Sequence, residues 1–266
     1  MNCKSEHEKI TSFIREKNDE LRTGGGVVGL SGGLDSSVCA KLIVDSLGIA
    51  GCLGIIMPAE DSNPKDRQDA LQFADYLGIA TEYYPVEKLL SLFEFEEKDF
   101  EKEVKPLLIN MQELLPPEIE LPFIMRLRGR AYILSYYSKK FNLFQCQTLE
   151  KTEWMLGLGD KFGDGAGDIA PLMHLFKSEV YELAEYLGLP RFVLDRKPTS
   201  GNYPLTDEEE LQMKYPEETD AILKRLLDGM SANEIANETG LELDKVCRID
   251  KMLKFSQVKR DIPQCL

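Results

Sequence analysis

The amino-acid sequence predicts an α/β fold: a three-layer α/β/α sandwich with a mainly parallel, doubly wound sheet of about five strands and a helical C-terminal region at about 205–266. Short apolar runs alternate with amphipathic stretches of helical length, which is typical of parallel strands joined by right-handed crossovers. A glycine-rich turn also stands between the first apolar run and the helix after it. Ligands of doubly wound sheets bind at turns of this kind.

The individual elements follow from the same patterns. Strands are expected where short apolar runs lie between turn residues, at 27–30, 52–57, 81–85 and 143–147. Helices are expected where apolar residues recur with helical spacing, at 5–22, 36–47, 63–78, 126–139 and 177–187. The charged stretch 94–103 favours a solvated helix or mobile loop over a binding segment.

The composition excludes several classes of protein. The 266 residues include 46 Asp and Glu against 32 Lys and Arg, so the net charge of −14 argues against binding nucleic acid or an anionic membrane through bulk charge. No apolar window approaches the ~18 residues of a membrane span, and the stretch 1–13 lacks the apolar core of a signal peptide. We therefore expect a cytoplasmic protein with no membrane and no nucleic acid among its partners.

The six cysteines form no CxxC pair, and the chain has two histidines, His7 and His174. In a chain of this length without a signal peptide, scattered cysteines indicate reduced thiols rather than a disulfide framework. A metal site built from Cys and His side chains is not expected either.

The most informative segment is Ser31-Gly32-Gly33-Leu34-Asp35-Ser36, which follows the first apolar run and opens a helix. Glycines let the backbone approach an anion, and the free N–H groups and dipole of a helix N-terminus favour negative charge. Asp35 would repel a phosphate unless Mg²⁺ stood between them. The order of strand, turn and helix favours a phosphate loop over a plain glycine turn. No GK[ST] follows, which excludes a Walker A loop.

This loop resembles the signature of the PP-loop ATP pyrophosphatases, which cleave ATP to AMP and pyrophosphate while adenylating a substrate. Over about residues 8–263 the chain is similar to the ammonia-dependent NAD synthetases within that group. The similar stretches are Met57-Pro58, Ser62-Asn63-Pro64, Arg128-Gly129-Arg130, Thr148 with Glu153, Lys161-Phe162-Gly163-Asp164-Gly165 with Asp168, Lys177, Lys197-Pro198-Thr199, 207–211, and Lys259-Arg260 with Pro263.

The resemblance implies a reaction and roles for residues. Nicotinic acid adenine dinucleotide would be adenylated by ATP and then amidated by ammonia, giving NAD, AMP and pyrophosphate. Asp35, Glu153 and Lys177 would be the catalytic residues, with Mg²⁺ as cofactor on Asp35 and Glu153. The implied ATP-binding residues are Gly29, Leu30, Ser31, Gly32, Gly33, Leu34, Asp35, Ser36, Thr148, Lys177 and Thr199. The implied contacts to the dinucleotide are Arg128, Lys161, Asp168 and Lys259.

The resemblance also implies an organisation for the whole chain. Residues 1–266 would form one PP-loop domain without a glutaminase domain, so free ammonia is the expected nitrogen donor unless a separate subunit supplies it. A homodimer with the dinucleotide site near the subunit interface is expected as well.

Five positions depart from the family pattern: Gln147, Glu150, Asp160, Leu205 and Val258. Most of them lie where the second substrate or a mobile loop would sit. They motivate an alternative, a PP-loop adenylating amidotransferase that acts on a different carboxylate.

A more distant alternative is an ATP-sensing DNA-binding regulator. The stretch 230–241 and the helix expected after it have the spacing of a helix-turn-helix motif. Four basic residues recur every three positions on that second helix: Lys245, Arg248, Lys251 and Lys254. The acidic excess of the whole chain argues against this interpretation.

Overall fold

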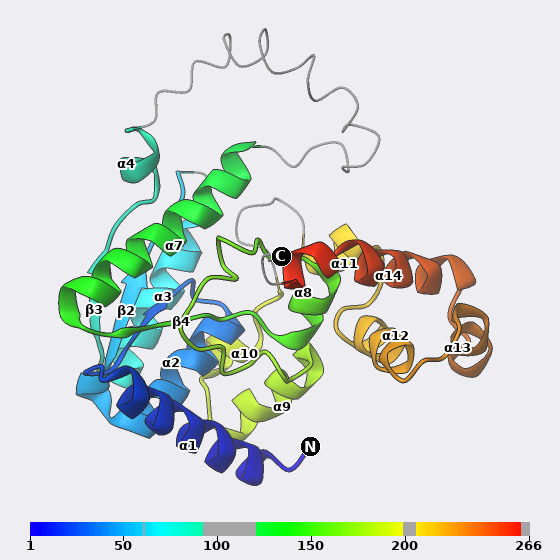
Figure 1. Ribbon diagram of the computed structural model, residues 1–266, viewed down its shortest axis with the longest axis horizontal. Helices are drawn as coiled ribbons and strands as arrows, with labels where there is room; N and C mark the ends of the chain where they lie inside the picture. Colours follow the sequence, from blue (N-terminus) through cyan, green and yellow to red (C-terminus); the bar gives the residue numbers. More distant parts are fainter. Residues whose placement is uncertain (61, 93–120, 199–205, 262–266) are drawn as a thin grey trace, which may run out of the picture.

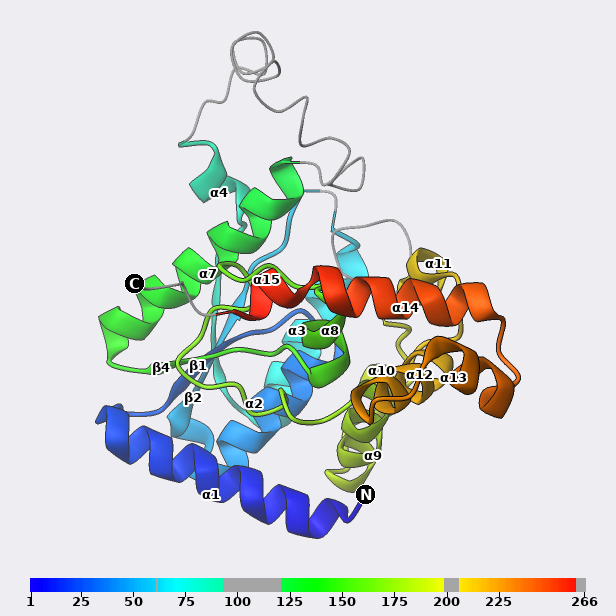
Figure 2. The same cartoon turned by 45° about the vertical axis from the view of Figure 1, so that its right-hand side comes forward.

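The structure, a computed structural model, describes residues 1–60, 62–92, 121–198 and 206–261. The charged stretch 94–103, Thr199 and Leu205 lie outside these residues. In the described part, the chain forms a parallel sheet with helices on both faces and a group of helices to one side (Figures 1 and 2). No helix in that part is both long and apolar enough to cross a membrane.

The sheet has four strands in the described residues, all parallel, in the order β3-β2-β1-β4. The strands are β1 (Gly26–Gly29), β2 (Cys52–Ile56), β3 (Ala80–Tyr83) and β4 (Phe144–Cys146). The chain therefore runs outward from β1 through β2 to β3, and β4 then lies on the other side of β1. Between β1 and β4 the strand order reverses, which is where ligands bind in doubly wound folds.

The described residues form four strands, where the sequence predicted a mainly parallel sheet of about five. Beyond β4, the part of the chain that the structure describes makes only an isolated parallel bridge between Cys146 and Ile169. Asp168 explains why no ladder forms, because its carboxylate accepts the backbone N–H of Gln145 at 2.7 Å. That N–H group is one that a neighbouring strand would otherwise use.

One face of the sheet is covered by four helices: α1 (Cys3–Leu21), α2 (Leu34–Leu47), α3 (Pro64–Leu77) and α9 (Lys177–Tyr186). Their apolar side chains form one buried cluster with Val28 and Ile56 of the sheet. The other face packs against α7 (Leu121–Phe141) and the short α4 (Glu87–Leu90) through Val27 and Ile55. Adjacent residues of each strand thus serve opposite faces, as the period of a strand requires, and the three-layer prediction is confirmed.

The predicted elements agree with the structure to within about two residues, except that α7 begins at Leu121, five residues before the expected position. Local signals account for this agreement. Asn63 caps α3 by accepting the N–H of Lys65 at 3.0 Å, and Pro64 occupies its first turn.

The C-terminal region is helical, as predicted, and has its own buried cluster around Leu211, Tyr215, Ile222, Ile235 and Ile249. Figure 2 shows these helices beside the sheet rather than on either face of it. The elements of this region and its surroundings are α8 (Lys151–Leu156), α10 (Arg191–Leu194), α11 (Asp207–Leu211), α12 (Glu217–Leu227), α13 (Ala232–Thr239), α14 (Leu243–Phe255) and α15 (Gln257–Arg260), with a 3₁₀ turn, η1 (Ile49–Gly51), before β2.

Candidate active site

A cavity of about 300 Å³ lies at the carboxyl ends of β1, β2 and β4, where the strand order reverses. Gly29, Ile56 and Cys146 end these three strands and all line it. Of the residues that the sequence singled out for ATP and catalysis, those in the cavity wall are Gly29, Leu30, Ser31, Gly33, Leu34, Asp35, Ser36, Thr148, Glu153 and Lys177. Three segments distant in sequence, 29–36, 148–153 and the start of α9 at Lys177, are thus brought together. Thr199 falls outside the described residues.

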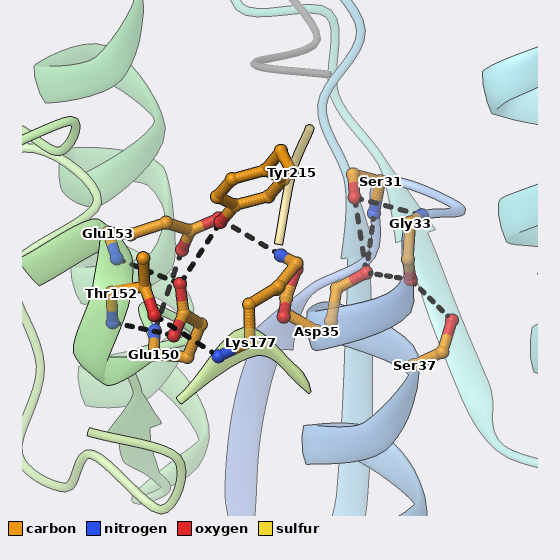
Figure 3. Close-up of polar contacts among 10 residues, drawn as sticks. Ser31, Gly33, Asp35, Ser37, Glu150, Thr152, Glu153, Lys177 and Tyr215 are labelled. Carbon is orange, nitrogen blue, oxygen red and sulfur yellow. Dashed lines mark hydrogen bonds and ion pairs between the residues drawn. The ribbon is translucent and has the colours of Figure 1, made fainter. Parts of the chain in front are cut away.

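The loop between β1 and α2 is held in shape by its serines (Figure 3). The hydroxyls of Ser36 and Ser37 donate to the carbonyl of Gly33 at 3.1 and 2.7 Å, and the N–H of Gly33 donates to Ser31 Oγ at 3.1 Å. Gly32 has a φ of +77°. Because α2 starts at Leu34, the N–H groups of its first turn face the cavity end of the helix, as an anion site requires.

Three charged side chains meet beside this loop (Figure 3). The ammonium of Lys177 lies 2.6 Å from Asp35 Oδ2 and 3.1 Å from Glu153 Oε1, and the lysine side chain is only 2% exposed. Lys177 is the first residue of α9, Asp35 lies in the first turn of α2, and Glu153 in that of α8. The resemblance had grouped these three residues as catalytic, but the sequence did not predict that Lys177 would lie between the two carboxylates.

Burial and charge shift the pKa values of this cluster. Burial alone would lower the pKa of Lys177, but the negative charges of Asp35, Glu153 and Glu150 outweigh it and raise the pKa well above its ordinary value. Burial raises the pKa of Glu153 to about 7, even though Lys177 opposes that shift. Lys177 therefore stays positively charged on both sides of neutral pH, whereas Glu153 changes its charge near neutral pH.

Glu150, one of the departures from the family pattern, has a clear structural place. It is fully buried and caps α8, accepting the N–H groups of Thr152 and Glu153 at 2.7 and 2.8 Å. The Tyr215 hydroxyl donates to the same carboxylate at 3.3 Å. Burial, followed by the charge of Glu153, raises the pKa of Glu150 well above its usual range. The cap holds Glu153 at the start of α8, facing Lys177.

Two contributors to the site had no signal in the sequence, Tyr215 and Asp220, both from the C-terminal region. Asp220 accepts the hydroxyl of Thr152 at 2.6 Å and the backbone N–H of Ser178 at 2.8 Å, so it ties the starts of α8 and α9 together. A lone Tyr and a lone Asp within a helical stretch look like any others, and only the tertiary structure brings them to the site.

The four residues expected to contact the dinucleotide lie beside the cavity, and none is among the residues that line it. Arg128 makes two hydrogen bonds to Asp160, at 3.1 and 3.2 Å, and Asp168 accepts the N–H of Gln145. Lys161 donates to the carbonyl of Asp261, and Lys259 to that of Gly159 at 3.0 Å. All four act on or around the glycine-rich stretch 157–168, which follows α8.

Two more of the departures from the family pattern, Asp160 and Gln147, contact the glycine-rich stretch 157–168 or lie in it. Asp160, in addition to holding Arg128, accepts the N–H of Phe162 at 2.9 Å. The Gln147 amide donates to the carbonyl of Gly165 at 3.2 Å, which fixes the stretch against β4. Val258 is 72% exposed, and nothing in the structure explains its presence there.

The second helix of the helix-turn-helix pattern, α14, does not present its basic residues as a free stripe. Lys245 pairs with Glu218 at 3.1 Å and Lys254 with Asp250 at 2.7 Å. Arg248 donates to the carbonyl of Leu211 at 3.1 Å. Lys245 and Arg248 thus connect α14 to the rest of the helical region, and Lys254 pairs within α14 itself, which argues against a DNA-binding element.

Comparison with known proteins places the chain in a family. A family model described as NAD synthase matches residues 6–263. The chain belongs to the NAD synthase family. It is 38% identical to the NH3-dependent NAD+ synthetase of Methanocaldococcus jannaschii over 96% of this chain and 93% of that protein. It is 34% identical to the enzyme of the same name from Thermococcus kodakarensis, over 96% and 94%. This membership favours neither alternative that the sequence had left open.

Solved structures agree with the family assignment. The chain superposes on a structure described as NMN synthetase from Francisella tularensis with a TM-score of 0.76 and 28% identity, covering 100% and 99% of the two chains. It superposes equally well, with 25% identity, on the NH3-dependent NAD synthetase of Campylobacter jejuni, again covering 100% and 99%. A glutamine-dependent NAD+ synthetase from Acinetobacter baumannii shares the fold at 20% identity, and this chain spans 47% of it.

Proposed function

We propose that this chain converts nicotinic acid adenine dinucleotide to NAD, with ATP as the activating substrate and ammonia as the nitrogen donor. The observation that carries the proposal is the convergence of the serine–glycine loop, Asp35, Glu153 and Lys177 in one cavity of a chain that belongs to the NAD synthase family. Members of this family use ATP as a substrate.

The reaction would proceed in two displacements. A nicotinate carboxylate oxygen forms a bond to the α-phosphorus of ATP, and the bond from that phosphorus to the bridging oxygen breaks, releasing pyrophosphate. Ammonia then forms a carbon–nitrogen bond to the activated carboxyl, loses a proton, and AMP leaves. Neither step needs a nucleophile from the protein, so its contribution is positioning and stabilisation of charge.

The residues of the cavity suit these tasks. The N–H groups of the loop 31–36 and the hydroxyls of Ser31 and Ser36 would bind phosphate oxygens. Lys177 and Thr199 would contact the ATP phosphates, and Thr148, which lines the cavity, would bind the nucleotide as well. Burial supports the role of Lys177, because a charge kept from water acts more strongly on a neighbouring phosphate.

Asp35 and Glu153 fit a divalent metal such as Mg²⁺. Asp35 Oδ1 is buried and accepts no hydrogen bond, although its partner oxygen is held by Lys177. Carboxylate oxygens are the ligands that Mg²⁺ prefers, and the metal usually keeps further oxygens from substrate phosphates. Mg²⁺ held there would supply positive charge against the phosphates. The described residues contain no group of three or more acidic, Cys or His side chains arranged to hold a metal without the substrate.

The second substrate would bind next to the nucleotide, near Arg128, Lys161, Asp168 and Lys259. The surface there is open: Arg128 is 47% exposed and Phe162 is 61% exposed. We propose that a second copy of the chain covers this region in a homodimer. We also propose that residues 1–266 act as one catalytic domain, in the cytoplasm.

One incubation tests the function. The purified chain is mixed with ATP, Mg²⁺, ammonium and nicotinic acid adenine dinucleotide, and NAD is measured together with AMP and pyrophosphate. Parallel reactions replace the dinucleotide with nicotinic acid mononucleotide, and ammonium with glutamine. NAD formation from ammonium is expected, with the dinucleotide preferred. Pyrophosphate release with another carboxylic acid, and none with the dinucleotide, would contradict the proposal.

A further inference from the structure

Arg196 reaches the phosphate loop from the segment after α10. Its Nη2 lies 2.9 Å from Asp66 Oδ1 and its Nη1 3.8 Å from Asp69 Oδ2, both on α3. The arginine side chain is 17% exposed, and that of Asp69 is 6% exposed. Two carboxylates on one helix therefore hold the guanidinium at a fixed position beside the cavity, of which Arg196 is a lining residue.

One nitrogen of this guanidinium is left unsatisfied. Nη1 is buried and makes no hydrogen bond. It lies next to Gly32, because a Cβ added to that glycine would come within 3.0 Å of it. A buried N–H group without an acceptor is costly. An anion bound by the loop would provide the acceptor.

Five described cations line the cavity: Arg67, Arg130, Lys177, Arg196 and Lys197. Three of them are held by other groups. The guanidinium of Arg67 lies over the ring of Tyr83, 4.2 Å from its centre, and Arg130 Nε donates to the carbonyl of Met57 at 3.1 Å. Lys177 is held between Asp35 and Glu153. These carboxylates add negative charge to a site that must receive a triphosphate, so a further cation at the loop would favour binding. Arg196 is the one whose Nη1 lies next to Gly32 of the loop.

We propose that Arg196 binds the pyrophosphate part of ATP, with Nη1 donating to a phosphate oxygen while Asp66 holds Nη2. The inference deepens the proposed function and rests on it. A guanidinium suits this task because its planar donors match phosphate oxygens and it stays charged at any working pH. Arg196 would also hold pyrophosphate after the first displacement, so its loss should affect product binding as well as ATP binding.

Calorimetric titration with inorganic pyrophosphate in the presence of Mg²⁺, and separately with AMP, tests the proposal on the wild type and three variants. R196Q should bind pyrophosphate about 10- to 100-fold more weakly, with AMP affinity changed less than about twofold. R196K keeps the positive charge but not the paired N–H donors of the guanidinium. Its affinity for pyrophosphate should lie between that of the wild type and that of R196Q. R191Q is the matched control, since Arg191 stands five residues earlier and is 77% exposed.

Unchanged pyrophosphate affinity in R196Q would overturn the proposal. An equal loss of affinity for pyrophosphate and for AMP would overturn it too, because a loop that has merely lost its support would bind both ligands more weakly. Thermal unfolding is followed in parallel. If R196Q does not fold, the same two affinities are compared in R196K, which still neutralises Asp66. A wild type that forms no NAD contradicts the proposed function instead, whereas pyrophosphate binding that ignores Arg196 in an NAD-forming enzyme contradicts only this inference.

Discussion

Lys177 and Asp35 are 142 residues apart in sequence, yet Lys177 Nζ lies 2.6 Å from Asp35 Oδ2. The pair joins the first turn of α9 to the first turn of α2, and Glu153 extends it to α8. Each of the three helices thus places its N-terminus at the same cavity. Acidic groups at helix N-termini are favourable, and the lysine between them keeps two carboxylates from repelling each other.

Removing this lysine should destabilise the fold. Lys177→Met leaves two carboxylates facing each other without their cation, and breaking a buried pair typically costs about 3–5 kcal/mol. Urea denaturation at about pH 8 measures the loss, which should be smaller at about pH 5, because Glu153 is then protonated. Lys224→Met is the control, since Lys224 is 41% exposed and 3.9 Å from Glu179. Equal stability of the two variants would contradict the prediction.

Neutralising either carboxylate should reduce turnover while preserving the fold. Asp35→Asn and Glu153→Gln are nearly isosteric, yet an amide cannot hold a hard cation as a carboxylate does. Each should lower kcat on the order of 10²–10⁴-fold. The double variant should lose little more than either single one, because both residues would serve the same ion.

Steady-state kinetics with pyrophosphate detection checks this, and Asp45→Asn serves as the control, because Asp45 lies at the other end of α2 and pairs with Lys41. The sequence alone also allowed Asp35 to be a helix cap, but Gly33 is the N-cap of α2 and Asp35 lies inside the first turn. If Asp35 only stabilised that turn, Asp35→Asn would turn over almost normally. Near-normal turnover at ordinary Mg²⁺ would therefore exclude the metal-binding role.

The pKa of Glu153 should determine how activity and stability depend on pH. Because it is raised from 4.5 to about 7 in the folded protein, the folded state binds more protons than the unfolded one between these pH values. The contribution of Glu153 to stability is then complete below about pH 4.5 and is lost as the pH rises through 7. Activity should change in the opposite direction, because only the ionised carboxylate binds a cation.

A pH profile of kcat/KM should therefore show an acidic limb near pH 7, which belongs to Glu153 together with the charges coupled to it. The profile of Glu153→Gln, measured at high enzyme concentration, should lack that limb. A limb that persists unchanged in the variant must come from another group.

Substituting Gly32 should affect the binding of ATP more than the stability of the folded protein. At φ +77°, an added Cβ would meet the carbonyl oxygen of Asp66 at 2.7 Å, which is backbone and cannot move aside alone. Gly32→Ala should raise the KM for ATP by at least about tenfold, since a misplaced loop loses several hydrogen bonds. Gly240→Ala is matched, with φ +72° and nothing within 4 Å of the new Cβ. It should cost only about 1 kcal/mol in a thermal melt and leave the KM unchanged.

The oligomeric state is testable independently of activity. A homodimer is expected, because closed two-fold dimers are the commonest soluble oligomers and because the surface around Arg128 and Phe162 is open. Light scattering over a range of concentrations should give twice the 30.2 kDa of the chain. A monomer at every concentration would mean that a single chain binds the dinucleotide alone.

Much of the fold was predictable because its signals are local. The alternation of apolar runs and amphipathic stretches indicated the four strands and the helices around them. The turn 31–36 could be placed between a strand and a helix because the apolar run before it and the helical pattern after it are both visible in the sequence. The number of strands was less predictable. The number of strands depends on whether the chain beyond β4 pairs with β4 as a further strand. It does not continue the ladder there, because the Gln145 N–H donates to the Asp168 carboxylate instead.

The site was predictable only where a motif carried it. Asp35 and Lys177 could be named, but their contact could not, because it depends on how α2 and α9 pack. Glu150 was noticed as a departure, and only the structure shows it as a buried cap with Tyr215 as its partner. Arg196 was not identified, since its unsatisfied nitrogen is a property of the folded cavity rather than of the sequence.

Asp220 and Tyr215 have a consequence for the order in which the protein becomes active during synthesis. The phosphate loop is made early, but Tyr215 and Asp220, which hold α8 and α9 in place, come about 180 positions later in the chain. When only the first half of the chain has left the ribosome, the loop is present but neither Glu153 nor Lys177 has been released. The contacts that hold Lys177 and Glu153 beside the loop are therefore complete only when translation has passed the C-terminal helices.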